Sequence, residues 1–154
     1  MDQKQKVVVS EFVKESLDKG FIQRSKSLQA SALFFIAKSD GCLHPVQDYC
    51  YINQNTVQNI YPLLCIDDLV DKLKDFDCFI KMDIWWGYNN VHIKEGDEWK
   101  PAFSCHEGLF EPLVMYFGLM NSLATFQAIM DDIFHEKMLQ GWLMDYMNDL
   151  LIGR

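Results

Sequence analysis

The chain has 154 residues, of which 49% are apolar, and a formal net charge of −8. This length and composition fit one folded domain with a substantial core and exclude a disordered or low-complexity protein. No apolar run approaches the ~20 residues that a membrane-spanning helix needs, and the polar N-terminus does not resemble a signal peptide. The negative charge argues against binding of nucleic acid over the whole surface.

Cysteine and histidine usage indicates a reduced, intracellular protein, either cytoplasmic or nuclear. The five cysteines are an odd number and form no CxxC motif, and the four histidines are scattered along the chain. We therefore expect free, mostly buried thiols and no structural zinc site.

The first third of the chain predicts a helix followed by a hairpin. Apolar residues within 9–17 recur at helical spacing, and the pattern predicts a helix that begins at a Ser10 cap and ends at Gly20. Two strand-like segments follow at 33–36 and 43–51, joined by a turn that contains Asp40-Gly41.

The rest of the chain alternates between helical and extended patterns. We expect a helix over 66–73, a buried strand over 79–84, extended segments at 88–93, 101–104 and 109–117, a helix from an Asn121 cap to about 139, and a closing hairpin over 142–152. Residues Ala124, Ala128, Ile133 and Phe134 are expected to face inward from the last helix. No repeat or linker interrupts this order, which predicts an α+β fold.

The closing hairpin carries the first candidate for chemistry. Two apolar runs flank Tyr146-Met147-Asn148-Asp149, a pattern typical of two strands joined by a tight turn that presents Asp149 at its tip. Asp83 closes another apolar run. If the two segments are neighbours in one sheet, Asp83 and Asp149 converge as a carboxylate pair suited to divalent cations. An isolated aspartate at a strand end, however, is more often a solvated residue than a metal ligand.

The other candidates have ordinary explanations when each is taken alone. Tyr88 could serve packing alone, and Lys38 could be a hairpin lysine that points to water. Phe117-Gly118 could mark the break between a strand and a loop. Basic residues in the first 40 positions either form a strip that binds a polyanion or belong to a solvated face balanced by acids. They are Lys14, Lys19, Arg24, Lys26 and Lys38.

Taken together and in order, these segments resemble the reverse transcriptase of gypsy-type LTR retrotransposons. The matching blocks include Met82-Asp83, Gly87-Tyr88-Asn89-Asn90, Phe117-Gly118-Leu119 and Ala124-Thr125-Phe126-Gln127, with others at 26–31, 47–53, 61–63, 93–100 and 108–110. The resemblance runs from about residue 10 to the end. It implies that residues 1–154 are a fragment of the fingers and palm subdomains of a right-hand polymerase, mixed along the chain. An antiparallel sheet with packed helices is expected, and the thumb, connection and RNase H regions are absent.

The resemblance also implies partners and a metal site. In the family, three aspartates hold two Mg²⁺ ions, with Mn²⁺ as a substitute, and their positions match Asp83, Asn148 and Asp149. The implied substrates are dNTPs and an RNA or DNA template-primer. An intact element would supply thumb, RNase H and integrase domains in the same polyprotein, and no membrane is implied.

Further positions match residues around the nucleotide and the template-primer. Tyr88 matches the residue that closes the sugar pocket and disfavours a ribose 2′-hydroxyl. The other positions implied for nucleotide binding are Lys38, His44, Ile84, Phe117 and Gly118, and those implied for the template-primer side are Tyr146 and Met147.

The departures from the family pattern fall on functional positions. Asn148 replaces a metal-binding carboxylate, and His44 replaces the arginine that clamps the triphosphate. A histidine is mostly neutral at pH 7 and has no bidentate fork. Other replacements are Cys50 for arginine, Trp85 and Trp86 for a basic and a small residue, and Tyr116 and Leu123 for prolines.

Two hypotheses follow. The chain is a reverse transcriptase domain that performs two-metal nucleotidyl transfer, lost or weakened in this copy by Asn148. Alternatively, it is a catalytically dead transposon remnant that acts at most as a nucleic-acid-binding or protein-binding fragment. Whether it is an enzyme is therefore left open by the sequence.

Overall fold

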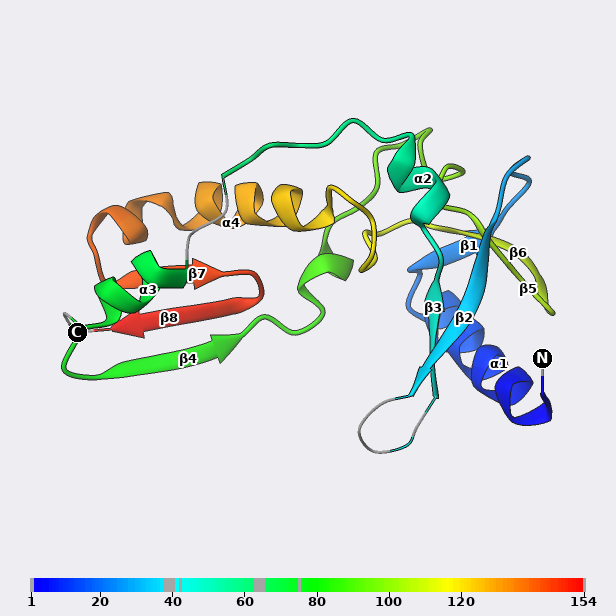
Figure 1. Cartoon of the computed structure of the whole chain (residues 1–154), viewed down its shortest axis with the longest axis horizontal. Coiled ribbons are helices and arrows are strands. Elements are labelled where there is room, and N and C mark those ends of the chain that lie inside the picture. The colour runs from blue at the N-terminus through cyan, green and yellow to red at the C-terminus, as the bar shows by residue number, and fades with distance from the viewer. Residues whose placement is uncertain (1, 38–40, 42, 63–65, 75, 154) are drawn as a thin grey trace. The chain divides into compact units, whose positions relative to one another are not determined.

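The computed structural model describes residues 2–37, 41, 43–62, 66–74 and 76–153. The chain folds as two compact units, and each is assembled from two separate stretches of sequence (Figure 1). Unit 1 comprises Met1–Thr56 and Asn89–Met120, and unit 2 comprises Val57–Tyr88 and Asn121–Arg154. None of the helices among the described residues is long and apolar enough to cross a bilayer.

Unit 1 is built on a five-stranded sheet in the order β1-β6-β5-β2-β3. Its elements are α1 (Gln3–Asp18), β1 (Ile22–Arg24), β2 (Ser31–Ala37), β3 (Leu43–Gln47), α2 (Cys50–Gln54), β5 (Phe103–Cys105) and β6 (Gly108–Pro112). All neighbouring strands are antiparallel except β2 and β5, which are parallel. The hairpin predicted in the first third is confirmed as β2 and β3, although β3 ends at Gln47 and a short helix follows.

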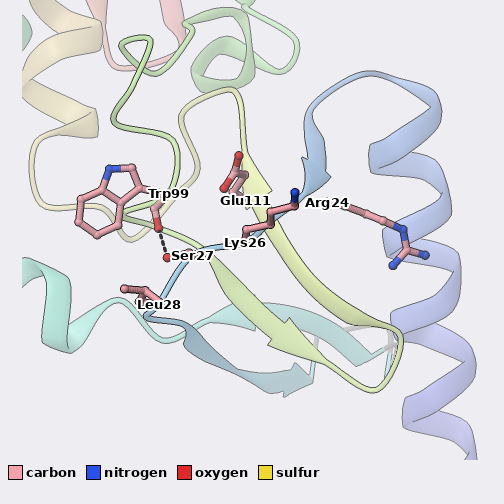
Figure 2. Close-up of a pocket in the computed structure, with 6 residues that line it drawn as sticks. All are labelled: Arg24, Lys26, Ser27, Leu28, Trp99 and Glu111. Atoms are coloured by element: carbon pink, nitrogen blue, oxygen red, sulfur yellow. Dashed lines mark hydrogen bonds between the residues drawn. The ribbon is translucent and has the colours of Figure 1, made fainter.

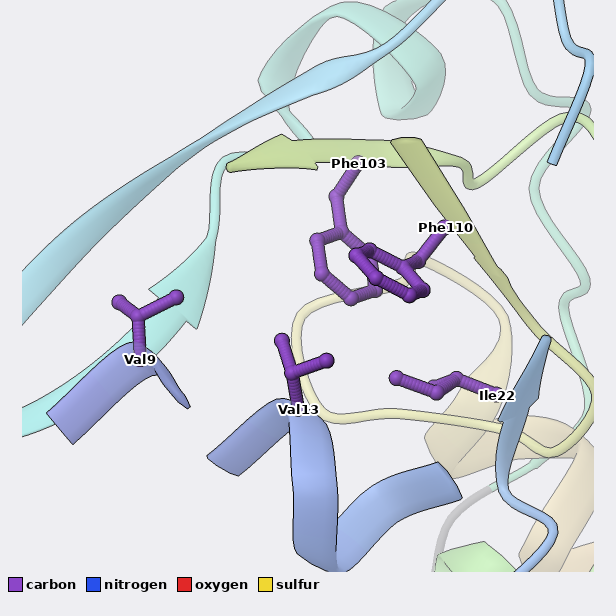
Figure 3. Packing of buried hydrophobic residues seen from close by; sticks show 5 residues of the cluster. All are labelled: Val9, Val13, Ile22, Phe103 and Phe110. Carbon is purple, nitrogen blue, oxygen red and sulfur yellow. The ribbon is translucent and has the colours of Figure 1, made fainter. Parts of the chain in front are cut away.

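The core of unit 1 lies between α1 and this sheet (Figure 3). Val9 and Val13 from α1 pack with Ile22, Phe103 and Phe110, and all five side chains are almost fully buried. The two phenylalanine rings stack with centroids 6.0 Å apart. This cluster accounts for the helical spacing of apolar residues in the N-terminal sequence.

The first helix begins eight residues earlier than the sequence predicted. Asp2 is its N-cap, its carboxylate accepts the Gln3 backbone N–H, and the Gln5 side chain accepts the Asp2 N–H to complete a capping box. Ser10 is therefore an interior residue of α1 and not a cap. The predicted extended segment at 88–93 is also wrong at its start, because Gly87–Asn90 forms the 3₁₀ helix η1.

Unit 2 contains a three-stranded antiparallel sheet in the order β4-β8-β7. Its elements are α3 (Ile66–Leu73), β4 (Phe79–Asp83), α4 (Ser122–Leu139), β7 (Leu143–Tyr146) and β8 (Asp149–Gly153), and α4 packs on β7 (Figure 1). The predicted helices and the closing hairpin are confirmed, and the α+β class is correct. Antiparallel pairs dominate both sheets.

Three expectations about burial are wrong. Every residue of β4 is exposed, although β7, the other edge strand of the sheet, is mostly buried where it packs on α4. Ile133 of α4 is 63% exposed. Among the described cysteines, Cys50 and Cys78 are exposed and Cys105 is half-buried, and all three are free thiols; the two remaining cysteines, at 42 and 65, lie outside the described residues.

A buried polar network joins β7 to α4. Asp145 is fully buried, and its Oδ2 accepts a 2.6 Å hydrogen bond from the Gln127 side-chain amide, while its Oδ1 has no partner. The same amide donates to Asp131, which also accepts from the Tyr61 hydroxyl. Burial, followed by the charge of Asp131, raises the pKa of Asp145 to about 6. The fold therefore carries a cost for ionising this carboxyl group.

Replacing Asp145 with Asn should stabilise the chain in a pH-dependent way. Since the folded pKa lies near 6 and the unfolded pKa near 3.8, the wild type loses stability as the pH rises through this window. Asp145→Asn removes the ionisation, so its advantage in unfolding free energy should grow from near zero at pH 4 to on the order of 2 kcal/mol above pH 6. Urea denaturation at a series of pH values measures this difference.

The matched control is Asp132→Asn, at an exposed position of α4. It should stay within about 0.5 kcal/mol of wild type throughout the range. An advantage of Asp145→Asn that is constant with pH would contradict the account of Asp145.

Candidate active site

The pairing of β4 with β8 places Asp83 directly opposite Asp149. Five residue pairs run in antiparallel register along these strands, and the pair of aspartates is the last at the hairpin end. Side chains directly opposite one another in an antiparallel pair leave the sheet on the same face. The two carboxylates that the sequence predicted to converge therefore share one face, where Asp83 is exposed and Asp149 is half-buried.

Tyr146 extends this row across the sheet. It pairs with Asp149 on the side away from Asp83, so the three side chains follow one another from β4 through β8 to β7. Asp145, the preceding residue, points to the opposite face, toward α4. The sheet thus has a helix-covered face and a face that carries the paired carboxylates.

The hairpin turn consists of Met147 and Asn148. Met147 has a φ of 57°, a backbone conformation that costs a residue with a side chain roughly 1–2 kcal/mol. Two contacts brace the turn: the Ile84 N–H donates to the Asn148 carbonyl at 2.7 Å, and the Met147 N–H lies 3.4 Å from Gln127 Oε1. Residues from both neighbouring elements therefore hold the tip of the hairpin.

The Asn148 side chain is directed into the protein. Its Oδ1 is buried and has no hydrogen-bond partner. A Cβ added to Gly87 would lie 2.7 Å from this oxygen and 2.9 Å from the Phe126 ring. The amide oxygen is thus packed against the Gly87 backbone, and only glycine leaves room for it.

Tyr88 lies in the same packed region. It is 5% exposed, and its ring centroid is 5.0 Å from that of Phe126. Burial raises the pKa of the Tyr88 hydroxyl above its ordinary value. Ile84 and the Gly87-Tyr88 segment, far from the hairpin in sequence, therefore lie next to its tip in the structure.

Lys81 was not predicted to belong to the site. Its Nζ lies 2.8 Å from Asp149 Oδ2, and the two side chains are 60% and 36% exposed. The hydrogen bond to Asp149 and its charge, with a smaller effect from Asp83, raise the pKa of Lys81. The ammonium group of Lys81 consequently lies beside the carboxylate pair.

The donors at this site fit one divalent cation better than two. Asp83 and Asp149 supply accessible carboxylate oxygens, the ligand type that Mg²⁺ and Mn²⁺ prefer. The third expected ligand, Asn148, keeps its only side-chain oxygen buried against Gly87. Within the described part of the chain, no group of three or more His, Cys, Asp or Glu side chains is arranged to hold a metal.

The remaining predicted nucleotide-binding residues belong to unit 1. His44 lies on β3 and is exposed, and Phe117 is 64% exposed. Gly118 has a φ of 93°, and its carbonyl accepts a 2.7 Å hydrogen bond from the Asn53 side chain, whose Oδ1 accepts the Met120 N–H. Asn53 therefore clamps the loop at 117–120. Lys38 lies outside the described residues.

The two tryptophans that follow Asp83 differ in conformation. Trp85 is 81% exposed. Trp86 is 45% exposed and has a φ of 58°, which is unfavourable for a residue with a side chain. Glycine at this position would adopt the turn with less strain.

A separate surface hollow of about 540 Å³ lies in unit 1 (Figure 2). Trp99 and Leu28 lie at one end of it, and the Ser27 hydroxyl donates to the Trp99 carbonyl. Arg24, Lys26 and Glu111 complete the lining. The hollow contains none of the predicted site residues, although it includes two members of the predicted basic strip.

Sequence reasoning gave no role to Lys81, Gln127 and Asn53. The position of Lys81 could have been predicted, because residues two apart in a strand lie on the same face and Lys81 stands two positions before Asp83. Gln127 and Asn53 lie within the family-like blocks, but their hydrogen bonds depend on tertiary contacts that the sequence does not specify.

Comparisons with known proteins identify the family of the chain. The family model described as reverse transcriptase (RNA-dependent DNA polymerase) matches residues 36–153. The Transposon Tf2-3 polyprotein of Schizosaccharomyces pombe is 36% identical over 91% of this chain, and the Tf2-7 polyprotein is 35% identical over the same share. The chain spans about 10% of the length of these polyproteins.

Solved structures show the same fold. The foamy viral protease-reverse transcriptase in complex with an RNA/DNA hybrid superimposes with a TM-score of 0.85 at 18% identity, over 100% of this chain and 20% of the viral chain. The same viral protein in complex with dsDNA gives 0.81 at 19% identity, over 100% of this chain and 32% of the viral chain. The fold is therefore that of reverse transcriptase fingers and palm, and the chain belongs to the reverse transcriptase family, as a fragment of a retrotransposon enzyme.

Proposed function

We propose that this chain is a template-directed nucleotidyl-transfer domain that extends a primer with dNTPs, and that its activity is weak because the site lacks one carboxylate. The observation that carries the proposal is the placement of Asp83 opposite Asp149 at the hairpin end of the sheet, where both carboxylates are accessible, with the Asn148 amide turned inward. Membership of the family supports the reaction class, and the foamy viral relatives with bound nucleic acid support a template-primer as partner.

Asp83 and Asp149 are the residues that would hold a divalent cation. When bound, Mg²⁺ or Mn²⁺ supplies positive charge that acidifies the primer 3′-hydroxyl and offsets the charge of the triphosphate. Tyr146 borders the carboxylate row. The role proposed for Tyr88, exclusion of a ribose 2′-hydroxyl, comes from the family resemblance, and its ring packs on Phe126 next to Gly87.

The lost carboxylate has a specific structural consequence. Asn148 is neutral, so its side-chain oxygen can be buried against Gly87 and Phe126 without leaving a charge unpaired. A carboxylate in the same place would pay a large desolvation cost, and it would be more stable if it rotated outward beside Asp83 and Asp149. Removal of one such electrostatic group typically costs about 10²–10³ in rate.

Asn148→Asp should therefore raise primer extension by about 100-fold. The physical reason is a third carboxylate on the exposed face, where a second cation can compensate its charge. The measurement is incorporation of dNTPs onto a primed RNA and a primed DNA template, with Mg²⁺ and with Mn²⁺.

Asn148→Ala is the control, because it removes the amide without adding charge, and it should leave incorporation at the wild-type level. If neither the wild type nor Asn148→Asp incorporates nucleotides while both remain folded, the chain is a catalytically dead remnant.

Gly87→Ala should destabilise the hairpin tip. The added methyl group would overlap the Asn148 oxygen and the Phe126 ring, and such overpacking typically costs about 1–3 kcal/mol. Equilibrium urea unfolding of the full chain measures the loss. Because Asn148 is the nearest obstacle, the loss should be smaller when Gly87→Ala is introduced into Asn148→Ala; equal losses in the two backgrounds would show that Asn148 does not pack on Gly87.

A further inference from the structure

Lys81 shares one face of the sheet with the two carboxylates. It lies two residues before Asp83 on β4, so both side chains leave the strand on the same side. Lys81 pairs with Leu151 on β8, which makes Asp149 its diagonal neighbour. A long side chain spans such a diagonal, and the 2.8 Å contact between Lys81 Nζ and Asp149 Oδ2 shows that it does so here.

Stability of the fold is a weak explanation for this ion pair. Both partners are more than a third exposed, and exposed ion pairs typically contribute about 0–1 kcal/mol. The alignment of β4 on β8 is already fixed by the backbone ladder along Phe79–Asp83. The position of the lysine therefore calls for an explanation based on the charge of the site.

The repulsion between Asp83 and Asp149 explains the position of Lys81. Two carboxylates placed directly opposite on adjacent strands repel each other. A cation beside Asp149 relieves this repulsion, and in this structure that cation is the Lys81 ammonium. A divalent ion held by Asp83 and Asp149 would bind either the Asp149 oxygen that Lys81 contacts or the other carboxylate oxygen, and in both cases the nearby ammonium would repel it.

We propose that Lys81 sets the metal affinity of this site, because its ammonium competes with a divalent cation for Asp149. The inference rests on the proposed function to the extent that Asp83 and Asp149 hold the cation. Lys81 acts through Asp149 and is a positioning residue. In the metal-free chain it keeps the Asp149 carboxylate in place, and its positive charge opposes the binding of a cation there.

Binding of Mn²⁺ alone to the purified full chain tests the proposal without any need for catalysis. Electron paramagnetic resonance of free Mn²⁺ gives the affinity and the number of ions bound. Lys81→Met should bind Mn²⁺ about three- to tenfold more tightly than wild type, since it removes a positive charge a few ångströms away. Lys81→Arg keeps the charge and should stay within about twofold of wild type.

Salt dependence separates electrostatics from an indirect structural effect. The advantage of Lys81→Met should shrink when the ionic strength rises from about 0.02 M to 0.5 M, because the interaction is screened. Circular dichroism in EDTA verifies that the variants are folded, and Lys81→Gln replaces Lys81→Met if the latter does not fold.

Two failures can be told apart. If Asp83→Asn and Asp149→Asn abolish Mn²⁺ binding but Lys81→Met and Lys81→Gln bind like wild type, the role of Lys81 is overturned and the carboxylate site stands. If both aspartate variants bind Mn²⁺ like wild type, the site itself is not where the cation binds, and the proposed function loses its basis.

Discussion

The antiparallel register between β4 and β8 is the constraint on which the candidate site depends. A shift of one residue would send Asp83 to the opposite face of the sheet, away from Asp149. The register is extended beyond the last pair by the hydrogen bond from Ile84 to the Asn148 carbonyl. The same register gives Lys81 its diagonal contact. One strand pairing thus determines the positions of two acids, one base and the hairpin tip.

The acidic residues on the two faces of this sheet differ in burial and in charge compensation. Asp145 is buried against α4, and its raised pKa reflects the cost of keeping a charge there. Asp149 remains accessible and has Lys81 as a counter-ion. Asn148 lies between them in sequence. It carries no charge and needs no counter-ion, so its amide can be buried beside Gly87 at a lower cost than a carboxylate. The packing around Gly87 therefore accommodates a neutral amide at position 148.

The sequence predicted the main parts of this arrangement and missed its details. Alternating apolar runs and the Asn-Asp turn indicated the closing hairpin, and the apolar run before Asp83 indicated its neighbour, because strand signals are local. The exposure of β4 was missed, since an apolar run does not reveal whether another element packs on the strand. The inward rotation of Asn148 and the ion pair of Lys81 depend on tertiary contacts with Phe126 and β8, which no local pattern encodes.

The central claim is that Asp83 and Asp149 form a cation site from which Asn148 is excluded. Anomalous X-ray scattering from crystals of the chain grown with Mn²⁺ tests it directly. We expect one Mn²⁺ peak within about 2.5 Å of a carboxylate oxygen of both aspartates, with the Asn148 amide still packed on Gly87. Two peaks that share the Asn148 oxygen, or a peak that contacts neither aspartate, would contradict the account.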